Sequence, residues 1–170
     1  MIAFSPCKVN LGLWICGKRP DGYHDMQSVF LPVQLCDSLE IHKSEIADLQ
    51  LYNADFEIPK EQNLLWKTYL LFQEKFKISP ISIDLVKQIP SGGGIGGGSG
   101  NVGTLMLMLN DYFKLNLSHT QLAELALEIG SDCPYFINPK PAVVKGRGEE
   151  IEVLSDFPKC YLVLLFSDVQ

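Results

Sequence analysis

The sequence predicts a mixed α/β fold of the α+β sandwich type. The first half of the chain is rich in β-type segments, many of which alternate between apolar and polar residues. The second half has apolar residues at helical spacing. The 170 residues are 46% hydrophobic, which is enough for a sizeable core, and a chain of this length fits one domain.

The strands of the first half are expected from their composition and alternation. They cover residues 9–15, 29–35, 39–42 and 49–52. A cluster of turn-forming residues at 17–22 separates the first two. Met1 leads almost directly into a strand-like stretch, so we expect no signal or transit peptide.

Three helices are expected after the first strands. The first has an apolar stripe with members three or four residues apart: Leu65, Tyr69, Phe72 and Phe76. A strand at 81–89 follows, and a second helix starts near Asn101. Its apolar face consists of Val102, Leu105, Leu109 and Phe113. A capping box at 118–121 opens the third helix, which Gly130 and Pro134 end.

The last part of the chain predicts three more strands, at 142–144, 151–154 and 161–166. The third of these is fully apolar, as a buried central strand would be. The sequence nevertheless stops soon afterwards, at Gln170. We therefore expect the chain to be cut short.

Composition excludes several classes of protein. The net charge of -6 and the lack of a basic stretch argue against a nucleic-acid partner. No apolar run approaches the roughly 20 residues of a membrane span, so no membrane partner is expected. The five cysteines are scattered and lack C-x-x-C spacing, which indicates reduced thiols of a cytoplasmic protein. The sequence does not indicate an oligomeric state.

The most informative segment is a glycine-rich run from Pro90 to Asn101, which holds seven of the fourteen glycines. Glycine lets a ligand approach without meeting a Cβ, and a loop that ends at a helix N-terminus offers free N–H groups to phosphate. No Gly-Lys-Ser/Thr follows, so this is not a Walker A loop, and Ser99 is the expected hydroxyl ligand. The alternative is a flexible linker, although linkers rarely join a buried strand to an apolar helix.

Three other polar groups could carry chemistry. Lys8 lies at the start of an apolar strand, where it is either a solvated edge lysine or the partner of a carboxylate or phosphate. Asp132 lies between a helix end and a proline, as a general base or as a helix-terminating turn residue. Tyr23 and His24 follow a tight turn, where they suit a nucleobase or form an ordinary hairpin turn.

Together these four groups resemble the GHMP kinases, which phosphorylate small metabolites with ATP. The resemblance rests on Pro-x-Lys-x-Asn at 6–10, Arg-Pro-Asp-Gly-Tyr-His at 19–24, the double triple-glycine loop, and Gly-x-Asp-x-Pro at 130–134. It implies a GHMP kinase N-terminal domain similar to the second domain of ribosomal protein S5. By this resemblance, residues 1–150 form the ATP-binding domain, and residues 151–170 begin a truncated C-terminal domain.

The resemblance also implies roles. The γ-phosphoryl group of ATP would pass to a hydroxyl of a cytidine diphosphate-linked methylerythritol in isoprenoid synthesis by the non-mevalonate route, with Mg²⁺ as cofactor. Asp132 would be the base, and Lys8 would keep it ionised and stabilise developing charge. The residues expected to bind the substrate are Asn10, Tyr23 and His24. Those expected to bind ATP are Asn63, near the adenine, and Pro90, Ser91, Gly92, Gly93, Gly94, Ile95, Gly96, Gly97, Gly98, Ser99 and Gly100. Ser99 would also serve Mg²⁺ through the phosphates.

Gly100 departs from the family pattern, which usually has a second serine at this point, so one hydroxyl is missing. Two alternative functions stay open from the sequence. One is another GHMP kinase, acting on mevalonate-type, homoserine or sugar substrates. The other is an inactive nucleotide-binding fragment of the same fold.

Overall fold

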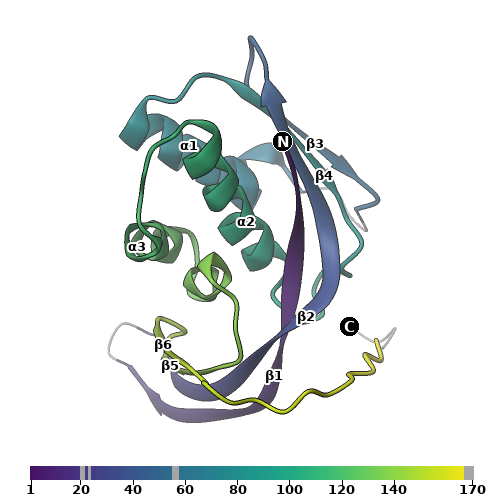
Figure 1. Ribbon diagram of the computed structural model, residues 1–170, viewed down its shortest axis with the longest axis vertical. Helices are drawn as coiled ribbons and strands as arrows, with labels where there is room; N and C mark the ends of the chain where they lie inside the picture. The colour runs from purple at the N-terminus through teal and green to yellow at the C-terminus, as the bar shows by residue number, and fades with distance from the viewer. Residues whose placement is uncertain (20–21, 23, 55–57, 167–170) are drawn as a thin grey trace.

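The computed structural model describes residues 1–19, 22, 24–54 and 58–166, and these form a sheet covered by helices on one face (Figure 1). The six strands are β1 (Ile2–Lys18), β2 (His24–Lys43), β3 (Asp48–Tyr52), β4 (Ile81–Val86), β5 (Ala142–Gly146) and β6 (Glu150–Val153). The helices are α1 (Leu64–Phe76), α2 (Gly97–Tyr112) and α3 (His119–Ile129), with short 3-10 segments η1 (Lys60–Gln62) and η2 (Cys133–Ile137). The predicted mixed fold is therefore confirmed.

The long strand β2 organises the sheet. One of its edges pairs with β1 in antiparallel register along most of its length. Its other edge pairs with β5 at residues 26–30 and with β4 at residues 38–43. Residues 31–37 of β2 have no strand partner on this second edge within the described chain. The gap lies where the polypeptide between β4 and α2 approaches the sheet.

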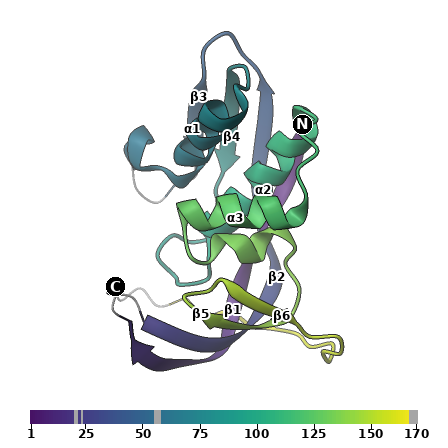
Figure 2. The ribbon, with the colours of Figure 1, turned by 90° about the vertical axis from the view of Figure 1, so that its left-hand side faces the viewer.

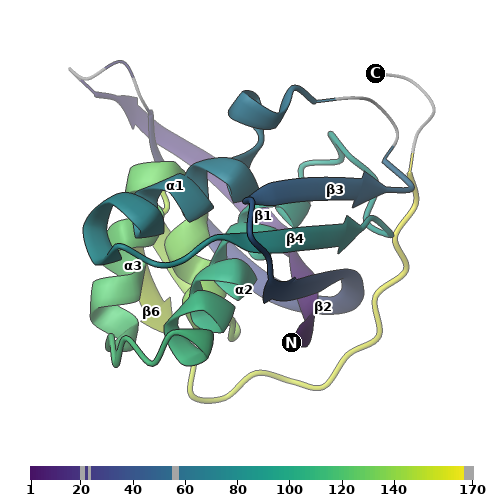
Figure 3. The same cartoon turned by 90° about the horizontal axis from the view of Figure 1, so that it is seen from above.

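The core lies between the sheet and the three helices, which Figure 3 shows grouped on one side of β3 and β4. Residues Leu39, Ile41 and Ile83 of the sheet are buried against Phe72 of α1 and Leu105 of α2. Figure 2 shows η2 below α3, next to β5 and β6. A second apolar cluster forms there, from Phe30, Tyr135, Phe136, Ala142 and Val144. Both clusters hold α2 in place against β1 and β2.

Local signals set the helix ends. The Asn63 side chain accepts a hydrogen bond from Leu65 N at 2.9 Å and caps α1. The Ser118 hydroxyl and the Gln121 side chain form the predicted capping box of α3. No helix of the described chain is long and apolar enough to cross a membrane.

Several of the predicted boundaries were wrong. The strand predicted at 9–15 runs from Ile2 to Lys18, because β2 pairs with it along this whole length. The strands predicted at 29–35 and 39–42 are one strand, because the polar residues between them find partners inside the molecule. The strand predicted at 81–89 ends at Val86, because the next backbone amides bind a side chain instead of a neighbouring strand. Helix α2 starts at Gly97, four residues before the predicted position near Asn101.

The apolar stretch 161–166 forms no strand, contrary to the prediction of a buried central one. Tyr161 is 103% exposed, Val163 85% and Leu165 92%. A strand needs a neighbour to take its backbone hydrogen bonds, and the described chain offers none at this place. Apolar composition alone did not reveal this requirement.

Candidate active site

The glycine-rich loop connects β4 to α2 and presents the start of that helix. Gly96, the N-cap residue, has φ of 72°, a left-handed conformation that glycine adopts readily. Within the part of the chain that the structure describes, no side chain caps the first turn of α2 and takes up its N–H groups. An anion at this point would meet both the free amides and the positive end of the helix dipole.

Lys8 of β1 contacts the middle of the loop from the other side. Its backbone N–H donates to Ile95 O at 2.8 Å, and its Nζ donates to Gly94 O at 3.2 Å. The Nζ also donates to Asn10 Oδ1 and lies 4.6 Å from the centroid of the Phe30 ring. The side chain is only 5% exposed, so these contacts hold the ammonium group in one place.

Asp132 meets this ammonium group from the segment between α3 and η2. Its Oδ2 lies 3.5 Å from Lys8 Nζ, and its side chain is 30% exposed. The two residues are more than a hundred positions apart in the sequence. The structure thus brings together a carboxylate that solvent still reaches and a buried cation.

A cavity of about 410 Å³ opens at this pair. Its lining combines charged and polar side chains, loop backbone and apolar side chains: Lys8, Val9, Asn10, Leu13, Met26, Phe30, Gly93, Gly94, Ile95 and Asp132. A substrate hydroxyl in this cavity would have the Asp132 carboxylate on one side and the glycine loop on the other.

Ser99 lies on the first turn of α2, next to η2. Burial raises the pKa of the Cys133 thiol to about 11, and a hydrogen bond with the Ser99 side chain lowers it in part. The Ser99 hydroxyl is thus directed toward the residue that follows Asp132. Cys133 is a buried free thiol, as the prediction of reduced cysteines expects.

A second cavity, of about 160 Å³, lies at the two ends of the loop and shares no lining residue with the first. Asn63, Lys87, Ser91, Gly98 and Asn101 line it together with apolar side chains. The structure therefore places Asn63 and Asp132 at different cavities. Lys87 and Asn101 carried no functional prediction, since neither belongs to a recognisable motif on its own.

The residues predicted to bind a nucleobase are only partly described. Tyr23 lies outside the described residues. His24 is exposed at the start of β2, opposite Lys18, and does not line the cavity at Lys8 and Asp132. Asn10 does line that cavity, and its Oδ1 accepts a hydrogen bond from Lys8.

Gly100 stands where α2 crosses β1. A Cβ at this position would lie 2.2 Å from Pro6 O and 3.2 Å from Ser5 Oγ. The backbones are too close for any side chain, and a serine would force the helix away from the strand. The close approach of α2 to β1 therefore explains why residue 100 is a glycine and not a serine.

Comparisons with known proteins show which proteins the chain is similar to in sequence and fold. The family description "GHMP kinases N terminal domain" matches residues 63–138. A protein of Bacteroides thetaiotaomicron named 4-diphosphocytidyl-2-C-methyl-D-erythritol kinase is 43% identical over 169 residues, which cover 97% of this chain and 62% of that protein. A protein of the same name from Porphyromonas gingivalis is 40% identical over 159 residues, covering 92% of this chain and 58% of that one.

Solved structures give the same picture. A crystal structure of 4-(cytidine 5'-diphospho)-2C-methyl-D-erythritol kinase has a TM-score of 0.76 at 31% identity, and the match covers 91% of this chain and 55% of that one. A homoserine kinase from Cytophaga hutchinsonii has a TM-score of 0.65 at 16% identity, which shows likeness of fold alone. The chain spans about 60% of the length of the curated relatives it matches.

Proposed function

This chain carries a GHMP kinase N-terminal domain, and from that premise we propose that its full-length protein transfers the γ-phosphoryl group of ATP to a hydroxyl of 4-diphosphocytidyl-2-C-methyl-D-erythritol. The observation that carries the proposal is the contact between Lys8 and Asp132, at the mouth of a cavity that the glycine loop lines. The names of the curated relatives supply the substrate.

Asp132 acts on the acceptor in this proposal. Its carboxylate is 30% exposed and faces the cavity, where it orients the substrate hydroxyl and accepts its proton as the oxygen attacks phosphorus. Lys8 pairs with the carboxylate and stabilises negative charge on the transferring group. The pair works mainly by position and charge, which is typical of phosphoryl transfer.

The ATP phosphates lie along the loop from Pro90 to Gly100, against backbone amides and the start of α2. Asn63, beside the second cavity, lies near the adenine. Mg²⁺ neutralises phosphate charge when bound. The described residues contain no cluster of three or more His, Cys, Asp or Glu side chains that could hold a metal ion. Ser99 would be the protein hydroxyl that serves a bound Mg²⁺, and ATP phosphates and water would complete its ligands, in keeping with the coordination Mg²⁺ prefers.

Asn10, Tyr23 and His24 bind the cytidine-bearing substrate. In this proposal Tyr23 stacks on the cytosine ring and His24 reads its edge. Asn10 supports the assignment most directly, because it lines the same cavity as Asp132.

We also propose that residues 1–150 form the ATP-binding domain and that residues 151–170 begin a C-terminal domain. The share of the relatives' length that the chain covers and the exposed apolar side chains at 161–166 support this division. The ring of Phe166 lies about 3.5 Å from where a Cβ of Gly93 would be, so this segment passes the glycine loop. We propose that the protein acts in the cytoplasm.

The test is ADP release by the full-length protein with 4-diphosphocytidyl-2-C-methyl-D-erythritol. We expect turnover by the wild type and a loss of about 10²- to 10⁴-fold in Asp132→Asn, the range for a general base. Asp84→Asn is the matched control, a carboxylate of β4 that lines neither cavity, and should keep wild-type turnover. Folded wild-type protein that releases no ADP with this substrate, or equal rates in Asp132→Asn, would contradict the proposal.

A further inference from the structure

Asp37 of β2 is a fully buried carboxylate with four hydrogen-bond donors. Its Oδ1 accepts from Gln88 N and Ile89 N, both at 2.8 Å. Its Oδ2 accepts from Asn101 Nδ2 at 3.0 Å and from Lys87 Nζ. A charge buried this deeply persists only when its partners satisfy it, and here they do so completely.

These donors come from both ends of the glycine loop. Gln88 and Ile89 directly precede Pro90, and Asn101 directly follows Gly100. Asp37 therefore closes the loop at its base with a single side chain. It lies in the part of β2 that lacks a strand partner on this edge, so the loop ends take the place of a neighbouring strand.

A glycine-rich loop needs such a closure in order to bind an anion tightly. Seven glycines give the free loop many conformations, and ordering them during binding would weaken affinity. Lys8 holds the middle of the loop through Gly94 and Ile95, while Asp37 holds its two ends. The amides that face the phosphates are then in position before the ligand arrives.

We propose that Asp37 is a positioning residue, which fixes the glycine loop for the phosphates of ATP without touching the nucleotide. The inference rests on the proposed function, because the ligand of the loop is the nucleotide of that reaction. The side chain is 0% exposed, so its effect passes through the loop backbone and Asn101.

The test compares Asp37→Ala and Asp37→Asn in the full-length protein, with ADP as the probe. The alanine variant leaves four donors without an acceptor, and we expect the Kd for ADP and the KM for ATP to rise about tenfold or more. The KM for the acceptor alcohol should stay within about twofold. Amides 92–98 should exchange hydrogen faster than in the wild type.

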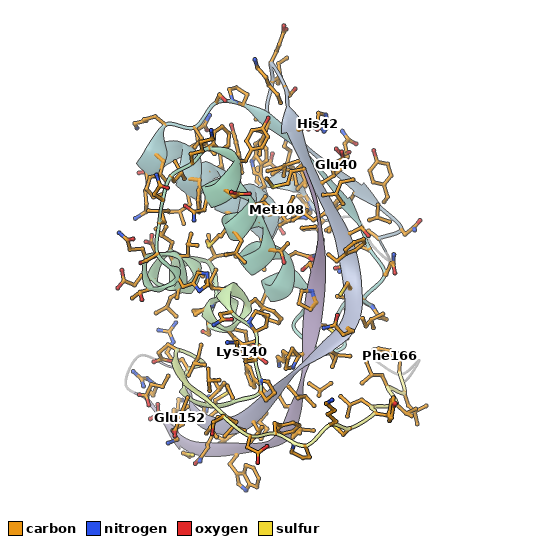
Figure 4. All side chains as sticks on the ribbon, viewed as in Figure 1. Glu40, His42, Met108, Lys140, Glu152 and Phe166 are labelled. Atoms are coloured by element: carbon orange, nitrogen blue, oxygen red, sulfur yellow. The ribbon has the colours of Figure 1, made fainter. Side chains whose placement is uncertain are left out.

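The asparagine variant should recover most of the loss, with a Kd within about threefold of the wild type. The introduced amide oxygen still accepts from Gln88 and Ile89. Among the described residues Asn101 Oδ1 has no hydrogen-bond partner, so this side chain can rotate and accept from the introduced NH₂ group. Asp84→Ala is the control, because Asp84 binds Tyr52 and His42 on the sheet face turned away from the helices, where Figure 4 shows His42 and Glu40.

Folded Asp37→Ala protein with wild-type affinity for ADP and wild-type loop exchange would overturn the inference. If that variant does not fold, hydrogen exchange of the wild-type protein with and without ADP tests the inference. ADP binding must slow exchange at the amides of Gln88 and Ile89 if these amides and the loop are coupled. Loop amides that become protected by ADP while these two remain unchanged would also overturn it. Wild-type protein that binds no ADP would instead overturn the proposed function. Hydrogen exchange of the loop amides, compared between Asp37→Ala and the wild type, would then test only whether Asp37 holds the loop.

Discussion

Two aspartate–lysine pairs contact the glycine loop, one at its middle and one at its ends, and they differ in how their carboxylates are satisfied. In the first, Asp132 is 30% exposed and meets Lys8 Nζ at 3.5 Å beside the larger cavity. In the second, Asp37 is 0% exposed and accepts from four donors, among them Lys87. The residue types are the same, but only one of the carboxylates has oxygen atoms open to an incoming group.

The comparison teaches that spare hydrogen-bonding capacity separates a reacting carboxylate from a positioning one. A general base must take a proton, so part of its acceptor capacity has to be free. A carboxylate that already accepts four hydrogen bonds in a buried place has no such freedom, and protonating it would break the contacts that hold it. Asp132 therefore suits chemistry, and Asp37 suits positioning.

The strongest way to break the first pair is Lys8→Met. This change removes the charge that stabilises the transferring group and the side-chain contact with Gly94, and it leaves Asp132 without its cation. We expect kcat of the full-length protein to fall about 10²- to 10³-fold, as when one transition-state contact is lost. Steady-state ADP release measures it, with Lys43→Met, at the exposed end of β2, as the control. A kcat within about tenfold of the wild type would contradict the role given to Lys8.

Asp37 should matter more than Asp132 for the stability of the fold. Asp37→Ala breaks a buried ion pair and should lower the free energy of unfolding by about 3–5 kcal/mol. Asp132→Ala removes a partly exposed carboxylate and should change it by less than about 1 kcal/mol. Urea denaturation of both variants measures this difference. Equal losses would mean that both carboxylates support the fold alike.

The close approach of α2 to β1 sets the distance between the pairs, because Lys8 lies on the strand and Asn101 on the helix. Gly100→Ala places a Cβ 2.2 Å from Pro6 O, and we expect a loss of about 1–3 kcal/mol in unfolding free energy. Gly98→Ala is the matched control in the same helix turn. Its Cβ would meet Leu64 Cδ1 at 3.6 Å, an ordinary contact, so we expect a gain of up to about 1 kcal/mol from helix propensity. Thermal or urea unfolding tests both, and a harmless Gly100→Ala would show that the helix can move.

A third pair, Asp48 with Lys60, extends the comparison to the surface. A hydrogen bond from Lys60 lowers the pKa of Asp48 from 3.8 to about 2, although the carboxylate is 43% exposed. Because the folded pKa is lowered, the stabilisation is complete above the unfolded value near 3.8 and is lost as the pH falls through about 2.

Lys60→Met should therefore shift the urea midpoint slightly at pH values above roughly 4, and the pH-dependent part of the shift should vanish near pH 2. The contact of Lys60 with the Trp66 ring, at 3.9 Å, does not titrate in this range and stays as a constant difference. A shift that is the same at both pH values would mean that the ion pair contributes nothing.

The sequence located the glycine loop, Lys8 and Asp132, because each belongs to a motif with a fixed spacing. It did not reveal Asp37. In the sequence this aspartate reads as a polar interruption between two apolar strands, and only the folded chain shows that donors from residues 87–101 satisfy its charge. The distance between Lys8 and Asp132 depends on how η2 packs under α3, which no local pattern encodes.

The stretch 161–166 was predicted as a buried strand that the structure does not contain. Its apolar side chains met every local criterion for a buried strand, yet burial depends on what lies beside a segment as well as on its composition. Helix α2 was misplaced for a related reason, since glycine is a poor helix former and its presence at residues 97 and 98 argued for a loop. Packing against β1 and α1 overrides that propensity.

The contact of Lys8 with Gly94 has a consequence for synthesis on the ribosome. The two residues are 86 positions apart, so at about 5–20 residues per second the lysine emerges several seconds before its partner exists. During that interval β1 and β2 can already form a hairpin, while the ammonium group waits in water and the apolar side chains of β1 lack their cover. The nascent chain therefore acquires the β1–β2 hairpin with Lys8 first and the glycine loop and Asp132 only later, and the hairpin is the part that a ribosome-bound chaperone would be expected to shield.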